Sequence, residues 1–186
     1  MAVQYKTRRF TTEQYYRMIE TGIIREGERV ELIDGEIVEM AAKSARHASS
    51  VAQSTAGLMF AVGRDAVVRS QMPIHLGPGF EPEPDVVVAR GPYTRYRRAH
   101  PSLPDILLAI DVADSSLDYD RRVKAPLYAR YAIPETWLSD LTTDRILVHR
   151  EPTEVGYQVV QVFGRGERVS PLAFPALSFA LEELLG

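Results

Sequence analysis

The stretch ILLAIDV at residues 106–112 places one carboxylate, Asp111, inside an otherwise apolar run. A short apolar run of this kind is typical of a strand that is buried on both faces of a sheet. A second run, PDVVV at residues 84–88, carries another acid, Asp85, near its start. Burying a carboxylate is costly unless a partner or a metal ion compensates for its lost hydration. Each acid alone has an ordinary explanation, because Asp85 could cap a turn after Pro84 and Asp111 could end its strand facing solvent.

The two acids together favour a metal site. Two carboxylates brought close raise each other's pKa, and a divalent cation between them removes this conflict. Such an ion could bind a phosphate oxygen and activate water for in-line attack. The chain has no cysteine, so a metal must be held by oxygen or imidazole ligands. Oxygen ligands favour magnesium, manganese or calcium over zinc.

Helical and strand patterns alternate around these two runs. Thr11 and Gln14 have the spacing of a capping box and predict a short helix, and Asp34-Gly35 predicts a two-residue hairpin. Further helices are expected over residues 44–63 and 118–131, with Pro126 either kinking the second or opening another short helix. Strands are expected over residues 67–76, 84–89, 106–112, 136–139, 146–149 and 157–163, and Ser178 is expected to cap a terminal helix carrying Leu181, Leu184 and Leu185. This order predicts one α/β domain, residues 1–186, with a mixed sheet.

Composition excludes several classes of protein. The 186 residues are 45% hydrophobic and 25% charged, which is ordinary for a globular protein, and the net charge is −3. The N-terminal segment MAVQYKTRRF lacks the apolar core of a signal peptide, and no run of about 18 apolar residues could span a membrane. We therefore expect a cytoplasmic protein without a membrane partner. Binding to DNA would need a local basic patch or an oligomer, because the overall charge is negative.

Several motifs resemble, in the same order, a large bacterial family of restriction-endonuclease-like proteins, a branch of the PD-(D/E)XK nuclease superfamily. They are EPD at 83–85, the acid at Asp111 and DYDRRVK at 118–124, with ELIDGE at 31–36, YAR at 128–130 and IPETW at 133–137. The resemblance covers about residues 10–150. It implies a restriction-endonuclease-like mixed sheet flanked by helices. It also implies an endonuclease that hydrolyses phosphodiester bonds in DNA with Mg²⁺ or Mn²⁺.

The resemblance also implies roles for single residues. Asp85 and Asp111 would be metal ligands, and Glu31 would complete the metal shell, with Glu36 a weaker candidate for the same role. A cross-strand ion pair on a half-exposed hairpin is the alternative for Glu31. His47 shares a helical face with Val51 and would orient a carboxylate or contact phosphate, although a core histidine with satisfied hydrogen bonds explains it equally well.

Two departures from the superfamily pattern bear on activity. The lysine expected two residues after Asp111 is replaced by Ala113, and Lys124 is the substitute that the resemblance suggests. A simple Asp120–Lys124 pair within one helix is the alternative. Asp111 is also shorter by one methylene than the glutamate more common in the family. These departures favour a second hypothesis, a weakly active or inactive nuclease-fold protein that serves as a DNA-binding or oligomeric interaction module. A third hypothesis is that the protein hydrolyses a phosphoester other than DNA.

Basic and aromatic residues alternate between the two acidic strands. Arg95, Arg97 and Arg98 are interleaved with Tyr93 and Tyr96. Arginines in this connection would bind phosphates, and the tyrosines would stack on sugar or base. A solvated loop or an oligomer contact is the alternative. Because cutting both DNA strands usually needs two active sites, we expect a homodimer.

Overall fold

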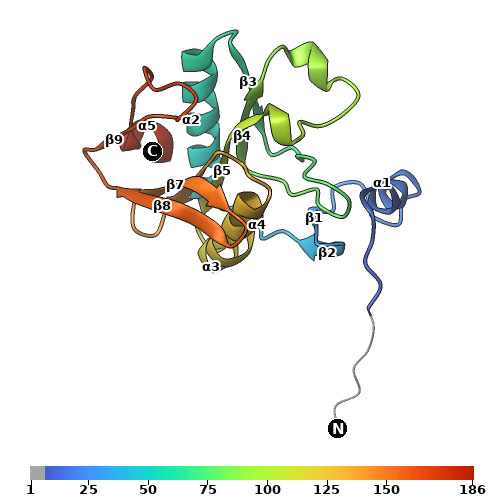
Figure 1. Cartoon of the computed structure of the whole chain (residues 1–186). Helices are drawn as coiled ribbons and strands as arrows, with labels where there is room; N and C mark the ends of the chain where they lie inside the picture. The colour runs from blue at the N-terminus through green and yellow to red at the C-terminus, as the bar shows by residue number, and fades with distance from the viewer. Residues whose placement is uncertain (1–6) are drawn as a thin grey trace.

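A six-stranded mixed sheet forms the centre of the computed structural model, which describes residues 7–186 (Figure 1). The strand order is β3-β4-β5-β6-β7-β8, and only β5 and β6 pair in parallel. The strands are β3 (Ala66–Ser70), β4 (Val86–Arg90), β5 (Ile106–Ala113), β6 (Glu135–Asp140), β7 (Arg145–Thr153) and β8 (Gly156–Phe163). The predicted mixed sheet flanked by helices is therefore confirmed.

β5 is buried on both faces, as its apolar sequence predicts. Leu108, Ile110 and Val112 face one core, which α2 (Ala45–Val62) and α5 (Leu181–Leu185) cover. Ala109 faces a second core that contains Tyr128. Since both faces are covered, the single acid within this strand lies in the interior of the protein.

Local capping signals define the N-terminal elements. α1 (Thr12–Glu20) begins with the predicted capping box between Thr11 and Gln14. β1 (Val30–Ile33) and β2 (Glu36–Glu39) form the predicted hairpin, a separate two-stranded sheet. Its turn residues Asp34 and Gly35 have φ values of 51° and 71°, both in the left-handed region that a type I′ turn requires.

The helical segment that carries Lys124 contains a π-turn. α3 (Leu117–Tyr119) continues into a π-helix (Asp120–Lys124) and then α4 (Ala125–Arg130). The Ala125 N–H donates to the Asp120 carbonyl, five residues back. Pro126 has no N–H and its ring crowds the preceding turn, so it is accommodated at the start of α4. Of the two predicted outcomes at this proline, the opening of a short helix describes the structure better.

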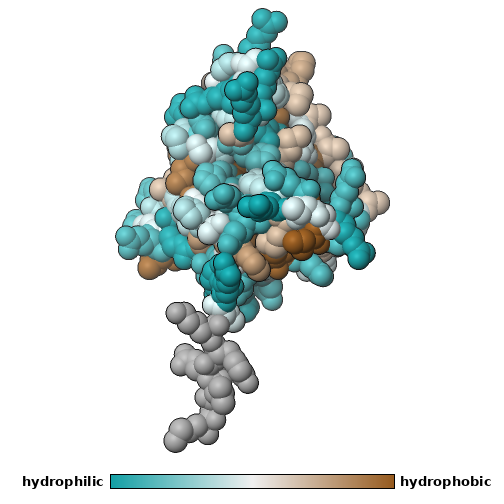
Figure 2. Space-filling model, turned by 90° about the vertical axis from the view of Figure 1, so that its right-hand side faces the viewer, coloured by the Kyte–Doolittle hydropathy of each residue, from teal (hydrophilic) through white to brown (hydrophobic). Residues whose placement is uncertain are grey.

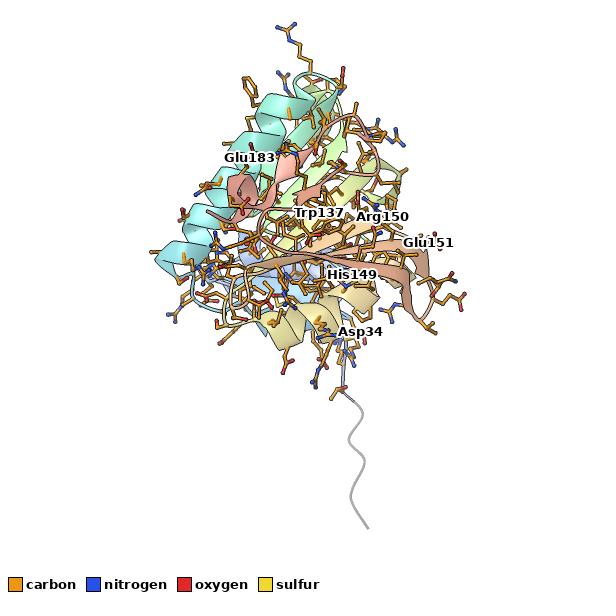
Figure 3. The ribbon with its side chains drawn as sticks, turned by 90° about the vertical axis from the view of Figure 1, so that its left-hand side faces the viewer. Asp34, Trp137, His149, Arg150, Glu151 and Glu183 are labelled. Atoms are coloured by element: carbon orange, nitrogen blue, oxygen red, sulfur yellow. The ribbon has the colours of Figure 1, made fainter. Side chains whose placement is uncertain are left out.

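The buried carboxylate of Glu135 in β6 connects β7 to the C-terminal segment. Glu135 accepts hydrogen bonds from Trp137 Nε1 at 3.0 Å, from Arg150 Nη2 at 2.7 Å and from the Leu172 N–H at 2.6 Å. Figure 3 shows Trp137 in the packed interior beside Arg150 of β7. This hydrogen-bond network, rather than a metal, explains why Glu135 can be buried in β6.

Two element predictions are wrong. The strand expected over residues 67–76 ends at Ser70, because Gln71 adopts a left-handed φ of 52° and turns the chain. Ser178 does not cap the terminal helix; it accepts a hydrogen bond from Arg168, within a short pairing of β9 (Arg168–Val169) with β10 (Phe179–Ala180). The helix begins only after Ala180.

The expectations about the N-terminal segment and the membrane are tested only in part. Residues 1–6, which the signal-peptide argument uses, lie outside the described residues. Within residues 7–186, no helix is long and apolar enough to cross a membrane.

Candidate active site

Lys124 stands at the centre of the candidate site. Its Nζ lies 3.2 Å from Asp111 Oδ1 and 3.3 Å from Glu31 Oε2, and it also donates to the Glu83 carbonyl at 3.4 Å. The ammonium group is buried. Its ion pairs in the described part of the chain are with Asp111 and Glu31, so the simple pair with Asp120 does not explain this lysine.

Asp85 is held next to β5 by hydrogen bonds to both carboxylate oxygens. Oδ2 accepts from the Val112 N–H at 2.9 Å and lies 3.1 Å from His47 Nε2, and Oδ1 accepts from Gln71 Nε2 at 3.2 Å. Burial opposes ionisation of Asp85, but the hydrogen bonds from His47 and Val112 outweigh it and lower its pKa. Asp85 is therefore an ionised carboxylate at neutral pH, placed beside the backbone that carries Asp111.

Glu31 reaches the site from the N-terminal hairpin. It is buried, accepts from the Glu83 N–H at 3.0 Å, and accepts from the Tyr119 hydroxyl at 3.1 Å. Its contacts are thus with the acidic centre and not with a cross-strand cation. Glu36, the weaker candidate, is exposed and pairs with Arg9 at 3.1 Å, outside the site.

The site holds more negative than positive charge. Burial raises the pKa of Asp111 to about 7; Lys124 opposes the rise, and Asp120, Asp85 and Glu31 add to it. Burial alone would lower the pKa of Lys124, but the surrounding carboxylates keep it well above its ordinary value. At neutral pH Lys124 is consequently an ammonium that donates hydrogen bonds. Its one charge does not neutralise the acids around it.

A cavity of about 220 Å³ opens beside this cluster. Its walls include Asp85, Glu31, His47 and Lys124, together with the cations Arg29 and Lys43. Asp111 does not line the cavity; it lies in contact with Lys124, which does. The cavity is thus lined by acidic side chains together with the cations Arg29 and Lys43.

The donor set fits a hard divalent cation held by few protein ligands. Within residues 7–186, no three His, Asp or Glu side chains meet as a ready-made metal cage. Mg²⁺ and Mn²⁺ do not need one, because Mg²⁺ in particular keeps several waters and is commonly held by one or two carboxylates plus substrate phosphate. Asp85 on the cavity wall supplies the kind of oxygen ligand that such an ion prefers, and the buried Asp111, in contact with Lys124, lies beside it.

The three predicted nucleic-acid-binding arginines are divided between two environments. Arg95 pairs with Asp105 at 2.6 Å. Arg97 and Arg98 line a second cavity, separate in its lining residues from the acidic one. The face that carries α1 and the connection after β4 is mainly hydrophilic (Figure 2).

Sequence reasoning missed Tyr119 and Gln71, which contact Glu31 and Asp85 respectively. Tyr119 and Lys124 are five residues apart, a spacing that puts them on different faces of an α-helix. Only the π-turn brings both toward the site, and nothing local in the sequence marks it beyond Pro126. Gln71 lies within the stretch predicted as a strand, where its turn conformation was not foreseen.

This α/β protein belongs to the restriction-endonuclease-like class. The features that define the class here are the sheet order, the flanking helices and two acids, Asp85 just before β4 and Asp111 in β5. A solved structure has the same fold: the crystal structure of a "putative nuclease belonging to DUF820" from Anabaena variabilis ATCC 29413. Its TM-score is 0.75 at 18% sequence identity, over 95% of this chain and 97% of that one. A model of the family Uma2, described as "Putative restriction endonuclease", matches residues 12–182. The chain belongs to this family. No curated protein matches it.

Proposed function

We propose that the protein is a metal-dependent endonuclease that hydrolyses phosphodiester bonds in DNA with Mg²⁺ or Mn²⁺. The observation that carries the proposal is a buried ammonium, Lys124, in contact with Asp111 and Glu31 at the edge of a cavity whose wall presents an ionised Asp85. Membership in a restriction-endonuclease family supports the same reaction class.

Asp85 and Asp111 would hold the ion, and Glu31 would complete its surroundings. A divalent ion in such a site supplies charge stabilisation of the phosphate and a more acidic water. Lys124, fixed as an ammonium, stabilises negative charge that builds on the phosphate. His47 holds Asp85 in one orientation through its 3.1 Å contact. Arg29 and Lys43 in the cavity wall attract the DNA backbone.

One set of observations favours the alternative of a nuclease-fold protein that binds DNA without cutting it. Lys124 already pairs with both Asp111 and Glu31, and Ala113 occupies the position of the usual motif lysine. In that case the lysine would replace the metal as the neutralising charge. Calorimetric titration with Mn²⁺ separates the two: an active site binds the ion and loses it in Asp85→Ala, whereas the alternative predicts no heat that depends on Asp85.

The proposal is tested by incubating the purified protein with supercoiled plasmid and Mg²⁺ or Mn²⁺. We expect nicking or cutting that Asp85→Asn abolishes, because the change removes the ionised carboxylate while keeping its size. Asp118→Asn is the matched control, since Asp118 is 84% exposed and pairs only with Arg122 in the described part of the chain. Absence of cutting across several metals and substrates, or equal cutting by Asp85→Asn, would sink the enzyme hypothesis.

DNA binding is tested separately through its salt dependence. We expect Arg97→Ala and Arg98→Ala each to reduce the slope of log affinity against log salt by about one, because each removes one phosphate contact. Arg95→Ala is the internal comparison: its guanidinium is already neutralised by Asp105 and should change the slope less. Equal effects at all three positions would show that the cavity position of Arg97 and Arg98 is irrelevant to binding.

A further inference from the structure

A second cavity, of about 600 Å³, lies between α1 and the two connections that flank β4. Its lining includes Tyr16 of α1, Glu81 and His75 of the β3–β4 connection, and Tyr96, Arg97, Arg98 and His100 of the β4–β5 connection. Planar rings and cations dominate this lining, and the acidic residues proposed for catalysis do not take part in it.

The ring of His100 is held neutral in this wall. Arg69 Nη2 lies 3.0 Å from His100 Nδ1, and because a guanidinium only donates, Nδ1 must accept and the proton must sit on Nε2. Burial lowers the pKa of His100, and the positive charge of Arg69 adds to the effect. Arg69 also lies over the ring of Tyr96 at 5.6 Å, so one half-buried cation contacts two cavity rings.

Tyr16 provides the facing ring. Its plane is inclined by only 19° to that of His100, with the ring centroids 6.2 Å apart. The Tyr16 hydroxyl donates to Glu81 Oε2 at 3.0 Å, and His75 Nδ1 lies 2.5 Å from Glu81 Oε1. Both oxygens of this buried carboxylate are therefore used to position rings. The rings of Tyr16 and His100 thus form one stacked pair in the cavity wall.

Positive charge remains available at the same cavity. Neither Arg97 nor Arg98 has an ion-pair partner among the described residues, in contrast to Arg95. Aromatic surfaces combined with unpaired arginines suit a group that is planar and carries phosphate.

The two cavities share one segment of chain. Glu81 lines the second cavity, and Glu83 and Asp85 line the acidic one. Two residues of extended chain span at most about 7 Å. Successive phosphates of a strand are about 3.4 Å apart along a duplex axis, so a strand that crosses the acidic cavity reaches the second within a few nucleotides.

We propose that the second cavity binds an unpaired nucleobase of a DNA strand, stacked on the paired rings of Tyr16 and His100, with flanking phosphates on Arg97 and Arg98. A base inside a duplex is covered on both faces by its neighbours, so only an extruded or single-stranded base can occupy such a cavity. The inference rests on the proposed function as a DNA nuclease and specifies its substrate class: DNA with an unpaired segment next to the cleaved bond.

The test is fluorescence anisotropy of a labelled single strand and of the matching blunt duplex, without divalent metal so that nothing is cut. We expect the intact protein to bind the single strand more tightly. Tyr16→Ala should weaken single-strand binding by roughly tenfold and leave duplex binding unchanged, because stacking on one ring is lost. Tyr16→Phe keeps the ring and should retain the affinity. Phe60→Ala is the matched control, an aromatic residue of α2 that is 93% exposed and does not line the cavity.

Three results would overturn the inference: unchanged single-strand binding by a folded Tyr16→Ala, an equal loss in Tyr16→Phe, or an RNA strand bound more tightly than DNA with the same dependence on Tyr16. If the protein cuts DNA but Tyr16→Ala binds normally, the inference fails and the proposed function stands. If Tyr16 governs single-strand binding but no metal supports cutting, the inference about the ligand stands and the nuclease proposal fails.

Discussion

At the scale of single residues, the distinctive feature is a lysine that the protein keeps charged in its interior. A buried charge is tolerated only when its partners are well placed, and removing one partner leaves the others uncompensated. Lys124 has two carboxylates and a carbonyl within 3.4 Å. Its removal should therefore affect stability as well as activity, which distinguishes it from an exposed catalytic residue.

We expect Lys124→Met to abolish cleavage and to lower the free energy of unfolding by about 3–5 kcal/mol at neutral pH. The loss should shrink as the pH falls. Without the ammonium, the pKa of Asp111, already raised by burial, rises further. The folded state then binds more protons than the unfolded state, and acid stabilises the folded variant. Urea unfolding at several pH values measures this, with Lys43→Met, another lysine of the cavity, as the control. A loss that grows toward acid pH would contradict the assignment.

His47 acts on the site through Asp85. Groups that orient a ligating carboxylate typically contribute tenfold to a hundredfold in metal affinity. We expect His47→Ala to weaken Mn²⁺ binding by about that factor while the chain stays folded, because the 3.1 Å contact with Asp85 is lost. His47→Gln, which retains a hydrogen-bond donor, should recover part of the affinity. Calorimetry measures both, and equal Mn²⁺ affinity in wild type and His47→Ala would exclude a positioning role.

At the scale of elements, the π-turn decides where Lys124 points. The Ala125 N–H already bonds to the Asp120 carbonyl, so deleting one residue between them turns this contact into an ordinary α-helical bond. Arg121 is exposed and can be removed at little cost. We expect the deletion of Arg121 to keep the fold and the cleavage activity, because Tyr119 and Lys124 then stand four apart on one α-helical face.

The opposite change supplies the control for this prediction. An alanine inserted between Arg121 and Arg122 adds one more residue to the π-turn. Neither an α-helix nor a π-helix then directs both Tyr119 and Lys124 at the site. We expect the insertion to abolish activity. Loss of activity on deletion of Arg121 would show instead that the π conformation itself, and not only the direction of Lys124, is required.

The turn between β6 and β7 predicts a separate pH dependence of stability. Asp140 Oδ1 accepts from the Thr142 N–H at 2.9 Å and from its hydroxyl at 2.6 Å, and Oδ2 accepts from Thr143 at 2.7 Å. Burial opposes ionisation, but these hydrogen bonds outweigh it and lower the pKa of Asp140. The stabilisation is therefore complete above the unfolded pKa of about 3.9 and is lost as the pH falls through the lower folded value.

We accordingly expect Asp140→Asn to cost about 1–2 kcal/mol of unfolding free energy at neutral pH. The difference from wild type should shrink below about pH 4, where the wild-type carboxylate also takes up a proton. Urea unfolding at neutral and acid pH measures it, and Asp118→Asn should change stability at neither. A constant difference across the whole pH range would mean that ionisation of Asp140 contributes nothing.

The elements that the sequence predicts correctly are those with local signals. Thr11 with Gln14, and Asp34 with Gly35, act within a few residues, and the apolar run of β5 is self-contained. The predicted strand over residues 67–76 fails because Ile74 and Leu76 are buried by packing and not by pairing in the sheet. Apolar periodicity does not distinguish those two cases.

The acidic site was predictable only in part for a related reason. Asp85 and Asp111 stand out locally, as acids in apolar runs. Glu31 comes from a distant hairpin and reaches the site through Tyr119 and Lys124. The second cavity is assembled from three separate segments, so no sequence pattern marks it.

At the scale of the whole molecule, the sheet ends in an unprotected edge. β8 is eight residues long, pairs within residues 7–186 only with β7, and contains no charged residue or proline. Val160 and Val162 are 49% and 52% exposed on it. Edge strands of stable monomers are usually short, charged or interrupted, because a long apolar edge pairs with other chains. In Figure 1, β8 forms the outer border of the sheet. We therefore expect a homodimer in which β8 pairs with β8 of a second copy.

Sedimentation equilibrium tests this expectation. The wild-type chain should sediment as a dimer, and the double variant Val160→Lys, Val162→Lys as a folded monomer, because two lysines per edge repel their counterparts across the pairing. Val155→Lys is the matched control: Val155 is 92% exposed but lies before β8 begins. A wild-type monomer at all concentrations would refute the edge pairing. Since a double-strand cut usually needs two active sites, the monomeric variant should nick plasmid DNA without linearising it, and this change in product connects the open sheet edge to the chemistry at Asp85.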